Sequence, residues 1–266
     1  EIGVRLVGSE MCIRDSYKGM TDEDVIELMS YGEISNLDER ENVVLVKRDG
    51  KNYVKKILST YNESVYRYLI CHPIAHMPQI SKVYRGDRYL VIIEEYIEGS
   101  SLSEYLKKGI FKPTEAVHIV RNLCCILNEL HTLECPIIHR DIKPSNVMLT
   151  KSGEVVLLDM NVAKWYDSEE KEDTRLLGTK DYAAPEQVGY GMKASSNKTD
   201  IYAVGILLNV MLTGKFPKEK PAQGKLWNVI ERCISLDANS RYRADELIER
   251  LDNYLGENTN AGKKDR

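Results

Sequence analysis

The chain has 266 residues, of which 42% are hydrophobic, and its 37 basic and 41 acidic residues give a net charge of −4 at pH 7. This length and composition allow one large domain, or two lobes that share a cleft, and the lack of a basic excess excludes an electrostatic surface for nucleic acid. No window approaches 18 uninterrupted apolar residues, so we expect no membrane span in this chain.

Cysteine usage indicates a reducing compartment. The chain has six cysteines, no C-x-x-C pair and no secretory signal, which favours free thiols and a cytoplasmic location. The cysteines are Cys12, Cys71, Cys124, Cys125, Cys135 and Cys233.

The two ends of the chain are expected to lie outside the folded part. Within residues 1–16, the stretch L-V-G-S-E-M-C-I-R-D-S resembles a translated sequencing adapter, so we expect a non-native or disordered leader. Residues 257–266 are polar and predict a tail. The folded part is then expected to span residues 17–256.

The first part of this span is predicted to be rich in strands. Apolar and β-branched runs predict strands over 43–46, 53–58, 83–84 and 89–93, and helical spacing predicts short helices over 25–29 and 61–69. Asp49-Gly50 lies between the first two of these strands and is typical of a two-residue hairpin turn.

The second part is predicted to be mainly helical. Helical periodicity begins near Pro113 and continues to about Leu130, and a helix over 200–212 is apolar nearly all round, as expected of a central buried helix. A further helix is predicted over 227–234, and short strands over 147–149 and 155–158. Together the two parts predict an α+β fold.

The residues that indicate chemistry lie in the loop 138–146, Ile-His-Arg-Asp-Ile-Lys-Pro-Ser-Asn. The loop lies between two apolar segments, and Pro144 prevents a helix from running through it. Transfer of a phosphoryl group to a hydroxyl needs a carboxylate to take the proton, a cation beside the gathering negative charge, and a metal ligand. Asp141, Lys143 and Asn146 provide these three types of group.

The motif H-R-D-I-K-P-S-N resembles the catalytic loop of serine/threonine protein kinases, and residues 178–186, G-T-K-D-Y-A-A-P-E, resemble a second specific motif of that family. The resemblance covers most of the chain and is to kinases of the bacterial, eukaryotic-like type. It implies a bilobal kinase fold, with a β-rich N-lobe over about 20–95 and a helical C-lobe over about 99–256. It also implies ATP and Mg²⁺ as cofactors and a protein substrate with serine or threonine.

The resemblance assigns roles around the catalytic loop. Asp141 would orient the substrate hydroxyl and accept its proton, and Lys143 would neutralise the moving phosphoryl group. Asn146 and Asp159 would hold metal, and Thr179 would contact Asp141 and Lys143. Lys143, two residues after the aspartate, favours serine/threonine over tyrosine substrates.

Further roles are implied for the nucleotide site. Tyr-Val-Lys-Lys-Ile-Leu (53–58) is similar to the kinase V-A-I-K strand with Lys56 in the last place, so Lys56 would bind phosphates, Val54 would pack on adenine and Lys55 would face solvent. Glu63 would hold Lys56, with an exposed glutamate at a helix start as the alternative. Backbone groups of Glu95 and Ile97 would bind adenine, and Glu94 would occupy the gatekeeper position.

Regulatory and structural roles are implied in the second half of the chain. Thr174 lies in an acidic activation segment, and its phosphate, added by autophosphorylation, would pair with Arg140 and order the segment. Asp200 would brace the backbone of the catalytic loop. Glu186 would pair with Arg241.

Two motifs depart from the family pattern. The segment between Tyr31 and Val43 has one glycine and several carboxylates where kinases have a glycine-rich loop over the phosphates, which indicates weak ATP binding or a loop held away from the nucleotide. Asp159-Met160-Asn161 replaces D-F-G, with asparagine able to take the left-handed backbone conformation of the glycine.

These departures leave a catalytically silent pseudokinase, acting as a nucleotide-binding or protein-binding scaffold, as the alternative. A small-molecule phosphotransferase is disfavoured by the Ala-Pro-Glu segment 184–186.

Overall fold

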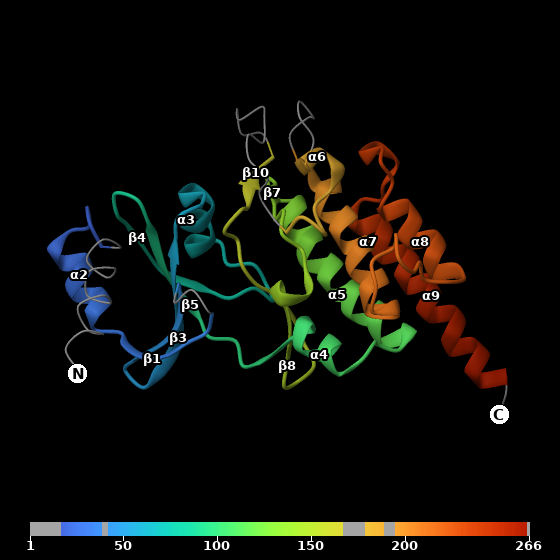
Figure 1. Cartoon of the computed structure of the whole chain (residues 1–266), viewed down its shortest axis with the longest axis horizontal. Helices are drawn as coiled ribbons and strands as arrows, with labels where there is room; N and C mark the ends of the chain where they lie inside the picture. The colour runs from blue at the N-terminus through green and yellow to red at the C-terminus, as the bar shows by residue number, and fades with distance from the viewer. Residues whose placement is uncertain (1–16, 39–41, 167–178, 189–194, 265–266) are drawn as a thin grey trace. The chain divides into compact units, whose positions relative to one another are not determined.

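The computed structural model describes residues 17–38, 42–166, 179–188 and 195–264, with side chains described as far as Glu257. The chain divides into two compact units (Figure 1). The first runs to Pro73 and continues over Pro78–Ile97, and the second consists of Ile74–Met77 and the chain from Glu98 onward. The leader predicted over residues 1–16 lies outside the described residues.

The first unit is built on a five-stranded antiparallel sheet with the strand order β1-β2-β3-β5-β4. The strands are β1 (Gly32–Asn36), β2 (Val43–Arg48), β3 (Lys51–Leu58), β4 (Ile80–Arg85) and β5 (Leu90–Glu95). The predicted hairpin joins β2 to β3. Asp49 and Gly50 have φ values of 50° and 78°, the left-handed conformation that a tight two-residue hairpin turn of this kind requires at both positions.

Helices flank this sheet on both sides. Helix α2 (Asp22–Met29), capped by the Thr21 hydroxyl, packs with residues just before and after it on the face that carries Val91 and Ile93. Helix α3 (Glu63–Cys71) contacts β4 on the other side of the sheet (Figure 1). The apolar cluster under α2 consists of Leu28, Tyr31, Val44, Val46, Tyr84, Val91 and Ile93.

Lys55 is buried under this N-terminal segment, so the prediction that it faces solvent is wrong. Only 4% of Lys55 is exposed, and its ammonium group pairs with Glu33 and donates to the Tyr17 hydroxyl at 3.2 Å. Burial would lower the pKa of Lys55, but Glu33 and Tyr17 together raise it above the ordinary value. The prediction treated this face of the sheet as open to solvent. In the structure, α2 and the residues before it cover this face.

The second unit is mainly helical. Its helices are α4 (Leu102–Lys108), α5 (Pro113–His131), α6 (Pro185–Val188), α7 (Asn197–Thr213), α8 (Lys225–Cys233) and α9 (Ala244–Lys264). Helix α7 is central, because it is apolar nearly all round and packs against both α5 and α8. Gly205 permits the close approach of α8, since a Cβ there would lie 2.6 Å from the Cβ of Cys233.

Short strands complete the second unit. Strands β6 (Gly99–Ser101), β8 (Val147–Thr150) and β9 (Val155–Leu157) form one small sheet, and β7 (Ile137–Ile138) pairs with β10 (Lys164–Trp165). These strands frame the loop 139–146, which carries the predicted chemistry. The predicted α+β fold, with strands concentrated in the first part and helices in the second, is confirmed.

The C-terminal residues differ from the prediction of a polar tail after residue 256, because α9 continues to Lys264. None of the helices in the described part of the chain has both the length and the apolar character needed to cross a bilayer.

Candidate active site

The loop 139–146 is held by a buried carboxylate on the central helix. The backbone N–H groups of His139 and Arg140 donate to Asp200 at 3.0 and 2.7 Å, and the Nε2 atom of His131 lies 2.8 Å from the same carboxylate. Asp200 is fully buried. Its two backbone contacts stabilise the loop at Arg140, whose φ of 71° is unusual for a residue with a side chain.

The charge of Asp200 is stabilised where it lies. Burial by itself would raise the pKa of Asp200, but the hydrogen bond and charge of His131, together with His139 and the Arg140 amide, hold it below the ordinary value. Asp200 thus makes the contact with the loop backbone that the sequence predicted. The contact of His131 with Asp200 was not predicted from the sequence.

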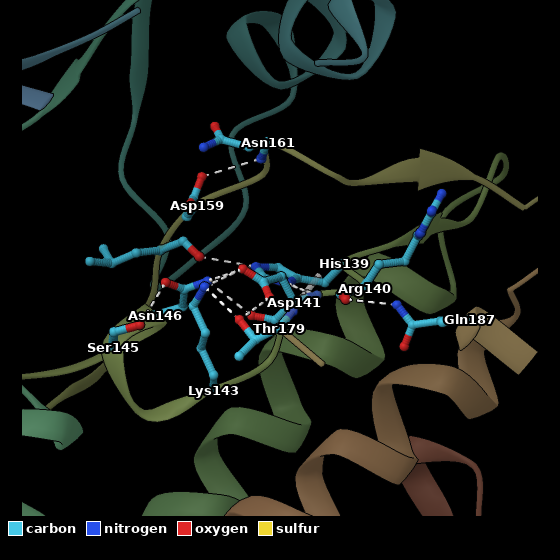
Figure 2. A network of polar contacts seen from close by, with 11 residues as sticks. His139, Arg140, Asp141, Lys143, Ser145, Asn146, Asp159, Asn161, Thr179 and Gln187 are labelled. Carbon is cyan, nitrogen blue, oxygen red and sulfur yellow. Dashed lines mark hydrogen bonds and ion pairs between the residues drawn. The ribbon is translucent and has the colours of Figure 1, made fainter. Parts of the chain in front are cut away.

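Asp141 is the centre of a polar cluster in the loop (Figure 2). Its Oδ1 accepts the Thr179 N–H at 2.9 Å and the Thr179 hydroxyl at 3.1 Å. Its Oδ2 lies 2.7 Å from the Lys143 ammonium and accepts the Asn146 Nδ2 at 3.0 Å. Lys143 also donates to the Thr179 hydroxyl at 2.9 Å. Four residues predicted to share the site are therefore in direct contact.

These contacts keep Asp141 ionised. Burial alone would raise the pKa of Asp141, but the hydrogen bond and charge of Lys143, with contributions from His139 and Thr179, lower it below the ordinary value. A carboxylate with a lowered pKa orients a hydroxyl well and is a weak base until the hydroxyl becomes acidic.

The segment around Asp159 lies beside Asn146. The N–H of Leu158 donates to the Asn146 carbonyl at 2.8 Å, and the Leu158 carbonyl accepts the ring Nε2–H of His139 at 3.0 Å. Figure 2 shows Asp159 and Asn161 on the turn that follows. His139 was not among the predicted site residues, although it stands inside the loop motif.

The left-handed residue of this turn differs from the expectation. Asp159 has a φ of 70°, whereas Asn161 has no positive φ. The Asp159 carboxylate accepts the Asn161 N–H at 3.2 Å, a short local hydrogen bond that aspartate can form and that helps it tolerate this conformation. The replacement of glycine by asparagine therefore does not need a left-handed backbone at position 161.

Oxygen atoms of Asn146 and Asp159 fit a magnesium ion. The Asn146 Nδ2 donates to the main-chain carbonyl of Asp141 at 2.9 Å and to its carboxylate, which directs the Asn146 Oδ1 away from Asp141. An amide oxygen and a carboxylate are hard ligands of the kind that Mg²⁺ prefers. The described residues contain no group of three or more His, Cys, Asp or Glu side chains that could hold a metal ion.

Thr179 is followed by a segment that is fixed to the core. Glu186 accepts two hydrogen bonds from Arg241 at 2.7 and 2.9 Å, and the Arg241 side chain is fully buried. Burial alone would raise the pKa of Glu186, but Arg241 lowers it below the ordinary value. The predicted pair of Glu186 with Arg241 is therefore present in the structure.

Gln187, the next residue, was not identified from the sequence. It is buried, donates to the Arg140 carbonyl at 2.9 Å and accepts the Ala184 N–H at 2.9 Å. It therefore links the Ala-Pro-Glu segment to the catalytic loop. The residues on either side of Gln187 carry no pattern that marks this contact.

The first unit places Lys56 and Val54 on one face of β3, both buried. The Lys56 ammonium forms an ion pair with Glu94 on β5 at 2.7 Å. The residue predicted at the gatekeeper position, Glu94, therefore provides a carboxylate that contacts this lysine.

Glu63 does not make the predicted contact with Lys56, and this pairing is corrected. The Glu63 carboxylate contacts Arg67 at 2.7 Å and Arg85 at 3.7 Å. Glu63 is the first residue of α3, where its charge favours the helix N-terminus and its side chain points to the arginines. The alternative, an exposed glutamate at a helix start, describes its position better, although only 29% of its side chain is exposed.

The segment between β1 and β2 uses a carboxylate to bind its own backbone. Asp38 accepts the N–H groups of Asn42 and Val43 at 2.9 and 3.1 Å. In the kinases that the sequence resembles, the corresponding segment covers the phosphates, so the departure seen in the sequence has a structural counterpart. At the end of β5, the Glu95 N–H donates to the Gln79 carbonyl at 2.9 Å, which leaves the carbonyl oxygen of Glu95 as its candidate adenine contact.

Thr174, the predicted phosphorylation site, lies outside the described residues. Arg140 is 5% exposed, and Figure 2 shows its side chain directed away from the Asp141 cluster.

The family model of the protein kinase domain matches residues 69–255. The chain belongs to the protein kinase family. The matched residues contain the Asp141 cluster, Asp159, Asp200 and the Glu186–Arg241 pair. They do not contain Lys56 or the segment around Asp38. That segment replaces the glycine-rich loop of other kinases.

Individual relatives agree with this family. The kinase is 28% identical to mitogen-activated protein kinase kinase 1 of Arabidopsis thaliana, over 88% of this chain and 75% of that protein. It is 29% identical to serine/threonine-protein kinase PrkC of Bacillus subtilis, over 73% of this chain and 30% of that protein. It is 35% identical to serine/threonine-protein kinase A of Synechocystis sp., over 47% of this chain and 26% of that protein.

The chain thus spans three quarters of the plant relative and less than a third of the two bacterial ones. The predicted membership of the kinase family is confirmed, and the relatives named as serine/threonine kinases support that class. They do not favour the pseudokinase alternative.

Proposed function

We propose that this kinase transfers the γ-phosphoryl group of ATP to serine and threonine hydroxyls of proteins. The observation that carries the proposal is the Asp141 cluster, in which one carboxylate is contacted by Lys143, Asn146 and Thr179 within 3.1 Å. A scaffold protein needs none of these contacts, whereas phosphoryl transfer uses a fixed carboxylate for the hydroxyl and an asparagine beside it for the metal.

Asp141 orients the attacking hydroxyl in this mechanism. Its lowered pKa keeps it ionised at neutral pH, so that it can accept a hydrogen bond from the substrate hydroxyl. Its contacts with Lys143, Asn146 and Thr179 hold the carboxylate in place. Because the transition state is loose, the hydroxyl becomes acidic late, and Asp141 takes the proton at that stage.

Cationic groups complete the site. The Lys143 ammonium, already within hydrogen-bonding distance of Asp141 and Thr179, neutralises charge on the moving phosphoryl group. Its place two residues after Asp141 favours serine and threonine hydroxyls. Lys56 binds the α- and β-phosphates of ATP.

Asn146 and Asp159 would hold Mg²⁺ through their side-chain oxygens, and the ion would supply charge neutralisation at the phosphates. Val54 packs on adenine, and the Glu95 carbonyl and the Ile97 backbone bind its edge. The buried position of Val54 and the engaged N–H of Glu95 support these assignments.

Phosphorylation of Thr174 activates the enzyme in this proposal. A phosphate adds about −1.5 to −2 charges, and the guanidinium of Arg140, the residue that precedes Asp141 in the chain, is the group that would pair with it. The free thiols of the described cysteines support a reducing, cytoplasmic setting.

The test is transfer from radiolabelled ATP to a generic basic protein, followed by identification of the modified amino acid. Asp141→Asn keeps the shape of the side chain and should reduce the rate by about 10²–10⁴. Equal incorporation by both proteins would assign the signal to a contaminant, and nucleotide binding without any transfer would support a scaffold. Label on tyrosine alone would contradict the serine/threonine class.

A second variant tests activation. Preincubation with ATP should raise the activity of the wild-type protein but hardly that of Thr174→Ala. Phosphatase treatment should reduce the activity of the wild-type protein to that of the variant. Full activity of Thr174→Ala after preincubation would rule out this switch.

A further inference from the structure

Lys56 and Glu94 form a buried ion pair between neighbouring strands. The two charged atoms lie 2.7 Å apart, and only 8% and 7% of the side chains are exposed. In the β3–β5 register Val54 lies opposite Glu94 and Lys56 lies opposite Ile92. Lys56 and Glu94 are therefore diagonal neighbours on the same face of an antiparallel pair, a spacing that long side chains bridge.

The helix carboxylate that the family pattern assigns to this lysine is used elsewhere. Glu63 contacts Arg67 one turn further along α3 and Arg85 on β4, and 29% of its side chain is exposed. Both of its partners lie at the exposed edge of the unit, since about half of each arginine side chain is accessible to solvent. Glu63 therefore belongs to a surface ion cluster of the helix start.

We propose that Glu94 is the positioning residue of Lys56 and takes the part that a carboxylate on α3 has in related kinases. This inference rests on the proposed function, in which Lys56 binds the phosphates of ATP. A lysine side chain has four rotatable bonds and loses considerable entropy when it is fixed. A buried carboxylate fixes it, and the ammonium group keeps further donors for phosphate oxygens.

The strand position of Glu94 has a regulatory consequence. In kinases whose lysine is held by the helix, movement of the helix breaks the pair and switches the enzyme off. Here both partners lie on strands of one sheet, and their contact follows from the strand register. The contact between Lys56 and Glu94 therefore needs no residue of α3.

The test compares Glu94→Gln with Glu63→Gln in the full chain, because both variants remove one negative charge from the same unit with almost no change in shape. Glu94→Gln should raise the KM for Mg-ATP by roughly 10²-fold, the effect of a misplaced binding group, and leave the KM for the protein substrate unchanged. Glu94→Asp should recover part of the ATP affinity. Glu63→Gln should stay within about twofold of the unchanged protein, as expected of an exposed ion pair.

Folding is checked separately, because loss of one partner from a buried pair destabilises a protein. Thermal unfolding of each variant sets the assay temperature. If Glu94→Gln does not fold, the Glu63→Gln measurement still decides. A tenfold or larger rise in the KM for Mg-ATP in Glu63→Gln, or an unchanged KM in a folded Glu94→Gln protein, would overturn the proposal.

Calorimetric titration with Mg-ATP distinguishes failure of the Glu94 proposal from failure of the proposed kinase function. If the wild-type protein neither binds Mg-ATP nor transfers phosphate, the kinase activity itself is contradicted. If the wild-type protein binds Mg-ATP, and Glu63→Gln but not Glu94→Gln weakens the binding, only the role of Glu94 is contradicted.

Discussion

Thr179 contacts Asp141 through both its backbone and its side chain, and both contacts end on the same carboxylate oxygen, at 2.9 and 3.1 Å. The hydroxyl also accepts a hydrogen bond from Lys143. The end of the activation segment therefore connects directly to the two side chains that carry the proposed chemistry.

Removal of this hydroxyl should slow catalysis without loss of the fold. Thr179→Val keeps the shape and the backbone N–H bond but removes a bond to a charged group, worth about 1.5–3 kcal/mol. We expect kcat to fall by roughly 10- to 100-fold with little change in the KM for ATP. Thr179→Ser, the control, should retain most of the activity in steady-state assays, and an equally slow serine variant would contradict a hydroxyl role.

Asp200 should contribute stability that depends on pH. A carboxyl group whose pKa is lower in the folded protein stabilises it above the unfolded pKa of about 3.9, and this contribution is lost as the pH falls through the folded pKa. Asp200→Asn should reduce the free energy of unfolding by about 3 kcal/mol at pH 7, with a smaller difference below about pH 4.

Urea unfolding at several pH values measures this difference. Asp252→Asn is a matched control, because Asp252 pairs with Arg121 at 3.1 Å but is 48% exposed, and such pairs contribute about 0–1 kcal/mol. A constant effect of Asp200→Asn across the pH range would show that its charge is not what stabilises the loop.

Glu186 and Arg241 should show strong energetic coupling. Replacement of Glu186 by Gln leaves the buried Arg241 guanidinium without its charged partner, which costs about 3–5 kcal/mol. In a double-mutant cycle with Arg241→Gln, we expect the two losses to be far from additive. The exposed pair of Lys225 and Glu257, at 2.6 Å, should give a coupling below about 1 kcal/mol in the same unfolding assay.

Asp38 should weaken ATP binding. Asp38→Asn keeps an oxygen for the N–H groups of Asn42 and Val43 but removes a negative charge from the segment that faces the phosphates in related kinases. The KM for Mg-ATP should fall several-fold, equivalent to about 1 kcal/mol, and the gain should shrink in high salt. Asp49→Asn, in the exposed β2–β3 turn, should have little effect, and a higher KM in Asp38→Asn would contradict the charge argument.

Local motifs carried most of what the sequence could predict. The loop 138–146 places Asp141, Lys143 and Asn146 within nine residues, so their proximity follows from the chain itself. The hairpin at Asp49-Gly50 and the apolar helix α7 were predicted for the same reason, since turn chemistry and hydrophobic periodicity are local signals.

Contacts between distant elements were harder to predict. The partner of Lys56 depends on the register of β3 against β5, which places Glu94 beside it, whereas spacing along the chain favoured Glu63. The contacts of His131 with Asp200 and of Gln187 with Arg140 join residues 69 and 47 positions apart. The burial of Lys55 depends on a segment that precedes the regular kinase elements.

That segment has a practical consequence for producing the protein. The family match begins at residue 69, but the cluster of Leu28, Tyr31, Val91 and Ile93 begins far upstream. An expression fragment cut at the family boundary would keep β5 with its apolar side chains exposed and without its neighbour β3. Bare strand edges and apolar patches promote aggregation, so the start point for recombinant work should precede Tyr17.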